Sequence, residues 1–247
     1  MHYLFHPLRA FMKKIAGLIL LPLSMGWAHA ADIPPFSQMQ PGAAVTGWAP
    51  VRPSAKAPDT IYTLVRDDDR TVLKAEADKS MSVLAHTIRV DLKKTPLLRW
   101  RWKISGPVKS ADMTKKSGDD YAGRVYVLFD YPVDKLSFAT RAKLKLGEAI
   151  YGQKIPTAAL NYVWDNRQPI GTLQANTYTD RARMLVIESG SDKAGQWVTE
   201  TRDVAADFRA AFGEDAPDVV VVAVATDTDN TGEQVTAWYG DLQFLAR

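Results

Sequence analysis

The chain has 247 residues, with no cysteine and four histidines, and its 31 Lys and Arg exceed its 28 Asp and Glu to give a formal net charge of +3. A chain without cysteine forms no disulfide, so its stability has to come from a buried core, which its aromatic residues and valines can supply. The shortage of cysteine and histidine also argues against a zinc site.

The first thirty residues have the pattern of a secretory signal peptide. Arg9, Lys13 and Lys14 form a basic start, the apolar segment 15–23 is too short to span a bilayer, and an Ala-His-Ala cleavage site ends at Ala30. We predict cleavage after that residue and a periplasmic mature protein without a membrane span. Cleavage removes three basic residues and no acid, and the remaining 31 − 3 = 28 basic residues balance the 28 acidic ones. The basic excess therefore gives no argument for nucleic-acid binding.

The segment 31–58 is rich in Pro and small residues, and we predict an extended lead-in with one short strand near Trp48. Two segments of alternating apolar and polar residues follow at 61–65 and 71–77. The residues 67–70 (Asp-Asp-Asp-Arg) between them have short polar side chains that suit a turn. These segments predict a β-hairpin.

The same alternation predicts long strands at 83–92, 97–104 and 121–131. In the second of these, Trp100 and Trp102 point the same way, and we assign them to the core. The opposite face of that strand carries three cations, which are Arg99, Arg101 and Lys103.

After the third strand the spacing becomes helical, which predicts a helix between a Ser137 cap and a Gly152 stop. Four further strands are predicted at 159–164, 171–177, 183–189 and 197–202. Asp203 as N-cap and Gly213 as C-terminal stop then predict a second, short helix. The last two strands are predicted at 218–225 and 236–245.

About ten strands with one or two helices, and no alternation of strand and helix, predict a mainly β fold. The expected architecture is an antiparallel β-sandwich of jelly-roll type, decorated by the helices. The expected organisation is a signal peptide at 1–30, the lead-in at 31–58 and a single sandwich domain at 59–247.

One candidate site is an acidic pair before the strand at 121–131. Asp120 lies four residues before Arg124 and shares its face. We therefore predict an ion pair between these two side chains. The pair either binds a hydroxyl-rich ligand, or the two side chains only satisfy each other's charge and hydrogen bonds.

Two connections combine aromatic rings with planar polar groups, which is the chemistry that recognises sugars. Their candidate binding residues are Trp164, Asp165, Asn166 and Arg167 in one connection, and Tyr178, Asp180 and Arg181 in the next. If both lie at one end of the sandwich, they form a binding rim. The alternative is a core tryptophan followed by an ordinary turn.

An acidic loop near the end of the chain is the candidate metal site. Its candidate ligands are Asp227, Asp229, Asn230 and Glu233. Carboxylate and amide oxygens of this kind suit Ca²⁺, although the spacing is not that of an EF-hand. The alternative is a plain turn between two strands.

Five sequence blocks stand out along the mature chain: LLRWRWKI, ADMTKKSGDDYAGRVYVLFDYP, NYVWDNRQPIGT, NTYTDRARMLVIESG and ATDTDNTGEQVTAWYGDLQF. Together they resemble the bacterial family catalogued as domain of unknown function 3047. The resemblance covers nearly all of the mature chain and implies no activity. The last block is also similar to jelly-roll carbohydrate-binding modules.

The sequence offers few groups for catalysis. His86, the histidine that remains after cleavage, lies among apolar strand positions, so we interpret it as a core residue. A nucleophile triad then has no base. The remaining route is a carboxylate pair, Asp120 with Asp165 or Asp180, as in glycoside hydrolysis.

Three functions stay open. The first is a periplasmic protein that binds a glycan or another envelope component without catalysis. The second is a carboxylate-dependent polysaccharide hydrolase or lyase. The third is an envelope scaffold that binds a protein through the cationic strand face. The shortage of catalytic side chains favours the first.

Overall fold

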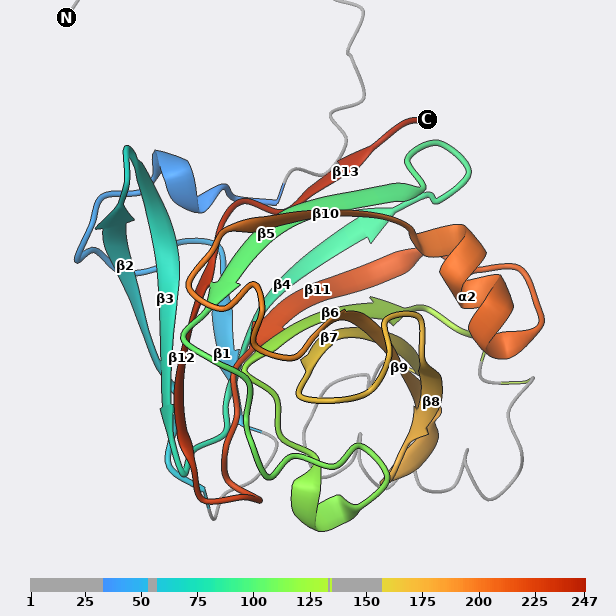
Figure 1. Cartoon of the computed structure of the whole chain (residues 1–247). Coiled ribbons are helices and arrows are strands. Elements are labelled where there is room, and N and C mark those ends of the chain that lie inside the picture. Colours follow the sequence, from blue (N-terminus) through green and yellow to red (C-terminus); the bar gives the residue numbers. More distant parts are fainter. Residues whose placement is uncertain (1–32, 53–56, 133, 135–156) are drawn as a thin grey trace, which may run out of the picture.

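The computed structural model describes residues 33–52, 57–132, 134 and 157–247, and these residues form two β-sheets with one α-helix (Figure 1). The signal peptide expected at 1–30 and the helix expected between Ser137 and Gly152 lie outside the described residues. In the described ranges, no helix is both long and apolar enough to cross a membrane.

The larger sheet has seven strands. In spatial order they are β1 (Ala49–Val51), β4 (Val83–Val90), β11 (Val219–Ala225), β6 (Gly123–Phe129), β7 (Ala158–Asp165), β9 (Thr179–Ser189) and β8 (Leu173–Asn176). The smaller sheet has six strands, which are β10 (Val198–Asp203), β5 (Leu97–Ile104), β12 (Gln234–Tyr239), β3 (Arg70–Asp78), β2 (Ile61–Asp67) and β13 (Gln243–Leu245) beside β5.

The predicted fold class is confirmed, because the described chain is a mainly β sandwich. One pairing departs from the antiparallel expectation, since β7 and β9 run parallel. The reason lies in the connection that follows β7. This connection carries the chain to β8 at the sheet edge, and β9 then returns between β8 and β7, antiparallel to the first and parallel to the second.

The predicted hairpin is confirmed as β2 and β3, which pair antiparallel up to Asp67 and Arg70. At the turn Asp68 has a φ of 51°, a left-handed conformation that Asp tolerates better than most residues. The strand predicted at 236–245 is divided into β12 and β13 by the three residues 240–242. The strand predicted near Trp48 is β1.

The core between the sheets follows the alternation of β5. Trp100 and Trp102 point inward as predicted, with exposures of 1% and 0%. The Trp100 ring stacks on Tyr162 of β7 at 5.2 Å, and the Trp102 ring lies 5.6 Å from Trp164 of the same strand. These contacts join the two sheets.

The short predicted helix is confirmed as α2 (Val204–Phe212). Asp203 caps its N-terminus by accepting a hydrogen bond from the backbone N–H of Ala206 at 3.0 Å. Gly213 ends it with a φ of 75°, the left-handed conformation that glycine adopts without strain. The helix packs Phe208 against Phe129 of β6, with ring centroids 4.6 Å apart.

A long loop, residues 105–122, contributes to a second apolar cluster on the outer face of the seven-stranded sheet. The cluster consists of Met113, Tyr121, Val163, Met184 and Val186. The loop includes a short 3-10 turn, η2 (Lys116–Gly118), and leads into β6. Another 3-10 turn, η1 (Phe36–Gln38), packs on β3. The 105–122 loop places Asp119 beside Arg124 of β6.

Candidate functional site

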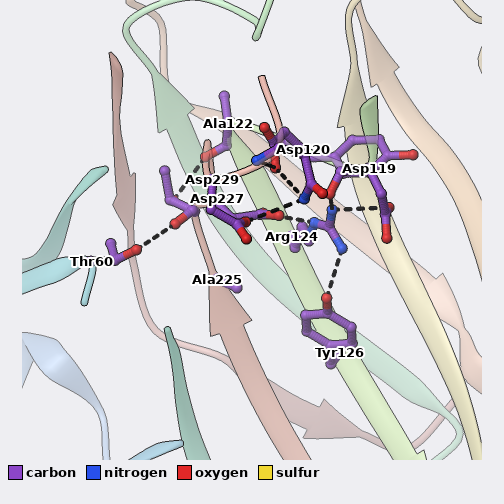
Figure 2. Close-up of polar contacts among 12 residues, drawn as sticks. Thr60, Asp119, Asp120, Ala122, Arg124, Tyr126, Ala225, Asp227 and Asp229 are labelled. Atoms are coloured by element: carbon purple, nitrogen blue, oxygen red, sulfur yellow. Dashed lines mark hydrogen bonds and ion pairs between the residues drawn. The ribbon is translucent and has the colours of Figure 1, made fainter. Parts of the chain in front are cut away.

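The centre of the candidate site is a buried arginine. Arg124, the second residue of β6, is 2% exposed. Its Nε lies 2.9 Å from Asp227 Oδ1, its Nη2 lies 3.1 Å from Asp119 Oδ1, and its Nη1 donates to the hydroxyl of Tyr126 at 2.8 Å. Figure 2 shows the guanidinium enclosed by these three groups. Every edge of the guanidinium therefore already has a protein partner.

The prediction that Asp120 pairs with Arg124 was wrong, because Asp119 and Asp227 are the partners. β6 begins only at Gly123, so the strand alternation does not extend back to Asp120. The Asp120 carboxylate turns instead toward the 226–233 loop. It accepts hydrogen bonds from the backbone N–H and the side-chain amide of Asn230 and from one further backbone N–H, at 3.3, 3.0 and 2.6 Å.

The site holds more acid than base. Asp119, Asp120 and Asp227 are buried and Asp229 is partly exposed, while Arg124 contacts two of these acids, Asp119 and Asp227. Burial by itself lowers the pKa of the guanidinium, but Asp227 and Asp119 raise it, so Arg124 stays charged. Burial raises the pKa of Asp227 well above its usual value, and the neighbouring carboxylates add to this effect although Arg124 opposes it. One arginine does not neutralise the cluster.

Three of these carboxylates have the placement of metal ligands. Asp120, Asp227 and Asp229 each offer an oxygen, and these oxygens lie within 4.8 Å of one another. This spacing suits a hard cation such as Ca²⁺. Asn230 lies beside these three carboxylates, and its side-chain amide donates a hydrogen bond to Asp120. Glu233 does not belong to this group of carboxylates. Its carboxylate instead accepts two hydrogen bonds from backbone N–H groups of the 105–122 loop, at 3.0 and 2.7 Å.

The 105–122 loop is the common partner of the connections that the sequence singles out. Asn166 donates from its amide to two carbonyls of this loop, both at 2.9 Å. Arg167 forms an exposed ion pair with Asp112 of the loop at 3.0 Å. Both residues thus help to hold the loop over the sheet.

Tyr178, in the turn between β8 and β9, lies against the same loop. Its hydroxyl is 3.2 Å from the carbonyl oxygen of Lys116 and 3.4 Å from Asn230 Oδ1, while 58% of the residue is exposed. The neighbouring Asn176 donates to Asp119 Oδ2 at 2.9 Å. The tyrosine therefore stands at the surface of the Arg124 network.

Besides Asn166 and Arg167, whose side chains contact the 105–122 loop, four predicted binding residues do not join the Arg124 network. Trp164 belongs to the core, and its indole N–H donates to the Gly190 carbonyl at 3.0 Å. Asp165 is buried and accepts backbone hydrogen bonds at 2.8 and 2.7 Å within its own turn. Arg181 packs over the Tyr131 ring at 4.3 Å, near the other end of β7. Asp180 is exposed beside it.

Three residues of the network were not among the predicted site residues. They are Asp119, Tyr126 and Asn176. Tyr126 was detectable in the sequence, because it shares the face of Arg124 two residues away. Asn176 is distant from Asp119 in the sequence, and only the fold brings the two side chains together, so no local sequence pattern indicates this contact.

The profile of a family described as protein of unknown function (DUF3047) matches residues 46–243. No curated protein matches the chain.

Several solved structures are similar in outline. The xyloglucanase domain of an effector from Sinorhizobium fredii has 10% identity and a TM-score of 0.43, with 83% of this chain and 96% of that one covered. The endoglucanase 3 of Trichoderma harzianum has 9% identity and a TM-score of 0.43, with coverages of 84% and 94%. A family 30 carbohydrate-binding module from Clostridium thermocellum has 11% identity and a TM-score of 0.33, with coverages of 88% and 95%.

Proposed function

We infer that this chain, which belongs to the family described as protein of unknown function (DUF3047), is an exported periplasmic protein that binds a glycan or another envelope component without catalysis. The expected signal peptide supports export. Tyr178, Asp229 and Asn230 form a solvent-accessible polar surface, the Tyr178 platform, which supports binding.

The observation that carries the proposal is the exposed ring of Tyr178 beside the acidic loop. The face of an aromatic ring stacks on the C–H groups of a sugar, and adjacent amide and carboxylate groups accept its hydroxyls. Asn230 and the partly exposed Asp229 provide such groups, and Asn230 lies within 3.4 Å of the Tyr178 hydroxyl. The buried Arg124 network fixes this surface in place, which lowers the entropic cost of binding.

Two of the acids proposed for catalysis, Asp120 and Asp165, are poorly placed for it, and the third, Asp180, is exposed away from Asp120 near the other end of β7. Asp120 and Asp165 are 0% and 1% exposed, and a carboxylate oxygen of each accepts a hydrogen bond from a backbone N–H group of a loop. A glycosidase acid has to reach the leaving oxygen of its substrate. His86 is also engaged, with its Nδ1 at 2.6 Å from the Gly47 carbonyl oxygen. This arrangement supports binding over hydrolysis.

A glycan array followed by calorimetry on the mature protein tests the proposal. We expect binding to weaken about tenfold or more in Tyr178→Ala and Asn230→Ala, as for residues at the centre of a binding surface. Ile61→Ala, an exposed residue of the other sheet, is the matched control. Turnover of a glycoside that is lost in Asp120→Asn would establish the hydrolase instead.

Export is tested separately by fractionating cells that produce the full chain. We expect the protein in the periplasmic fraction, with Ala31 as its first residue by N-terminal sequencing. An uncleaved protein in the cytoplasm would contradict the proposed location.

A further inference from the structure

A polar hollow lies on the outer face of the six-stranded sheet, away from the Tyr178 platform. It has a volume of about 470 Å³. Three arginines line it, Arg70 at the start of β3 and Arg99 and Arg101 from β5. Thr199 of β10 and Gln243 of β13 complete its polar wall.

A β-bulge shapes this hollow. Tyr239 pairs with Trp102 and Gln243 pairs with Arg99, so the chain advances four residues on one strand and three on its partner. The extra residue falls within 240–242, where β12 gives way to β13. A bulge bends the strand and redirects the side chains around it.

The bulge also positions Arg101. A Cβ atom on Gly240 would lie 2.4 Å from Arg101 Cγ and 2.7 Å from its Nε, so only glycine leaves room for the arginine stem. On another side the Arg101 guanidinium lies over the Trp197 ring at 4.2 Å. Arg101 is thus held between a glycine and an aromatic ring.

Within the described part of the chain, the residues that line the hollow carry more positive than negative charge, with three arginines and one aspartate. Arg70, Arg99 and Arg101 form no ion pair among the described residues, whereas Lys103 of the same strand pairs with Asp67. The acid that lines the hollow is Asp241. Both of its carboxylate oxygens accept hydrogen bonds from Ser37, one from the backbone N–H at 2.9 Å and one from the hydroxyl at 2.5 Å.

We propose that this hollow binds an acidic saccharide, with its oxyanion held by Arg99 and Arg101. Guanidinium groups hold carboxylate and phosphate oxygens through paired N–H donors. Thr199 and Gln243 can hydrogen-bond ring hydroxyls, and the volume falls in the usual range for small-ligand sites. The acid is either a uronate or a sugar phosphate, which share this chemistry. The site is independent of the Tyr178 platform.

Calorimetry in phosphate-free buffer tests the proposal with four probes: glucuronate, glucose 6-phosphate, neutral glucose and inorganic phosphate. We expect the two acidic sugars to bind more tightly than glucose or phosphate, and their affinity to fall as salt rises. Their relative affinities distinguish the uronate from the phosphate source. In the double variant Arg99→Gln, Arg101→Gln we expect at least a tenfold loss. Arg89→Gln, an exposed arginine of the other sheet, is the control and should bind like the wild type.

Gly240→Ala provides a second variant that leaves every charge in place. Because the new methyl group displaces Arg101, we expect weaker binding of the acidic sugar, whereas the Arg89→Gln control should bind like the wild type in the same assay. Circular dichroism verifies that each variant is folded. Equal affinity in wild type and double variant would overturn the site, and inorganic phosphate binding as tightly as the acidic sugars would overturn the saccharide assignment.

Discussion

Among single residues, Arg124 is unusual because its charged group is buried between two aspartates and Tyr126. Removing it leaves the carboxylates of Asp119 and Asp227 buried without their cation. We expect Arg124→Met to lower the free energy of unfolding by about 3–5 kcal/mol, as for other broken buried ion pairs. Urea unfolding followed by fluorescence measures this loss.

A matched control is Arg167→Gln, which removes an exposed ion pair to Asp112. Its effect should stay below about 1 kcal/mol, the usual value for such pairs. An Arg124→Met variant as stable as the wild type would show that the carboxylates do not need the arginine.

Asp229 provides a second prediction at this scale. In buffer containing EDTA, Asp229→Asn removes like-charge repulsion from Asp120 and Asp227, so we expect its melting temperature to rise by about 2 °C. Ca²⁺ should raise the melting temperature of the wild type and have little effect on the variant, since a ligand stabilises only the state that binds it. If the wild type melts at the same temperature in EDTA and in Ca²⁺, the 226–233 loop does not bind Ca²⁺ and only connects two strands.

The sequence predicted which segments carry the polar site, but it misassigned individual contacts. The pairing of Asp120 with Arg124 failed because side-chain direction is predictable only inside a regular strand, and residues 119–122 precede β6. Partners such as Asn176 lie more than fifty residues away in the chain. Their positions depend on strand order, which no local pattern encodes.

At the scale of elements, β10 carries a pH-sensitive group. Burial, together with the nearby Glu188, raises the pKa of Glu200 to about 7. A pKa above the unfolded value means that this residue contributes stability at low pH and loses it as the pH rises through about 7. Glu200→Gln keeps an oxygen for the Trp102 indole N–H and removes the titration.

We therefore expect Glu200→Gln to match the wild type near pH 4 and to exceed its unfolding free energy at pH 8. The difference should be on the order of 1 kcal/mol, since solvent screens this partly exposed group. Urea unfolding at both pH values measures it. An equal difference at the two values would contradict the assignment.

Elements with strong local signals were predictable. The strict alternation of β5 predicted its inward tryptophans, and the Asp203 cap with Gly213 predicted α2. The bulge between β12 and β13 was missed, although Gly240 inside the predicted strand is a residue typical of bulges. The parallel pairing of β7 with β9 depends on where a connection crosses the sheet.

At the scale of the whole molecule, one core joins both sheets and α2. We expect urea unfolding to follow a single transition, with fluorescence and circular dichroism coincident, as for one cooperative domain. This tests the predicted single domain at 59–247. Two separated transitions would show that the sheets unfold as independent units.

The strand order has a consequence for biogenesis. The interior strands β11 and β12, one in each sheet, both come from the last thirty residues of the chain. A nascent polypeptide lacking them has four unpaired strand edges, those of β4, β6, β3 and β5. Neither sheet can be completed before these two strands are synthesised, so we expect a chain that lacks them to leave the facing strands unpaired and exposed to aggregation.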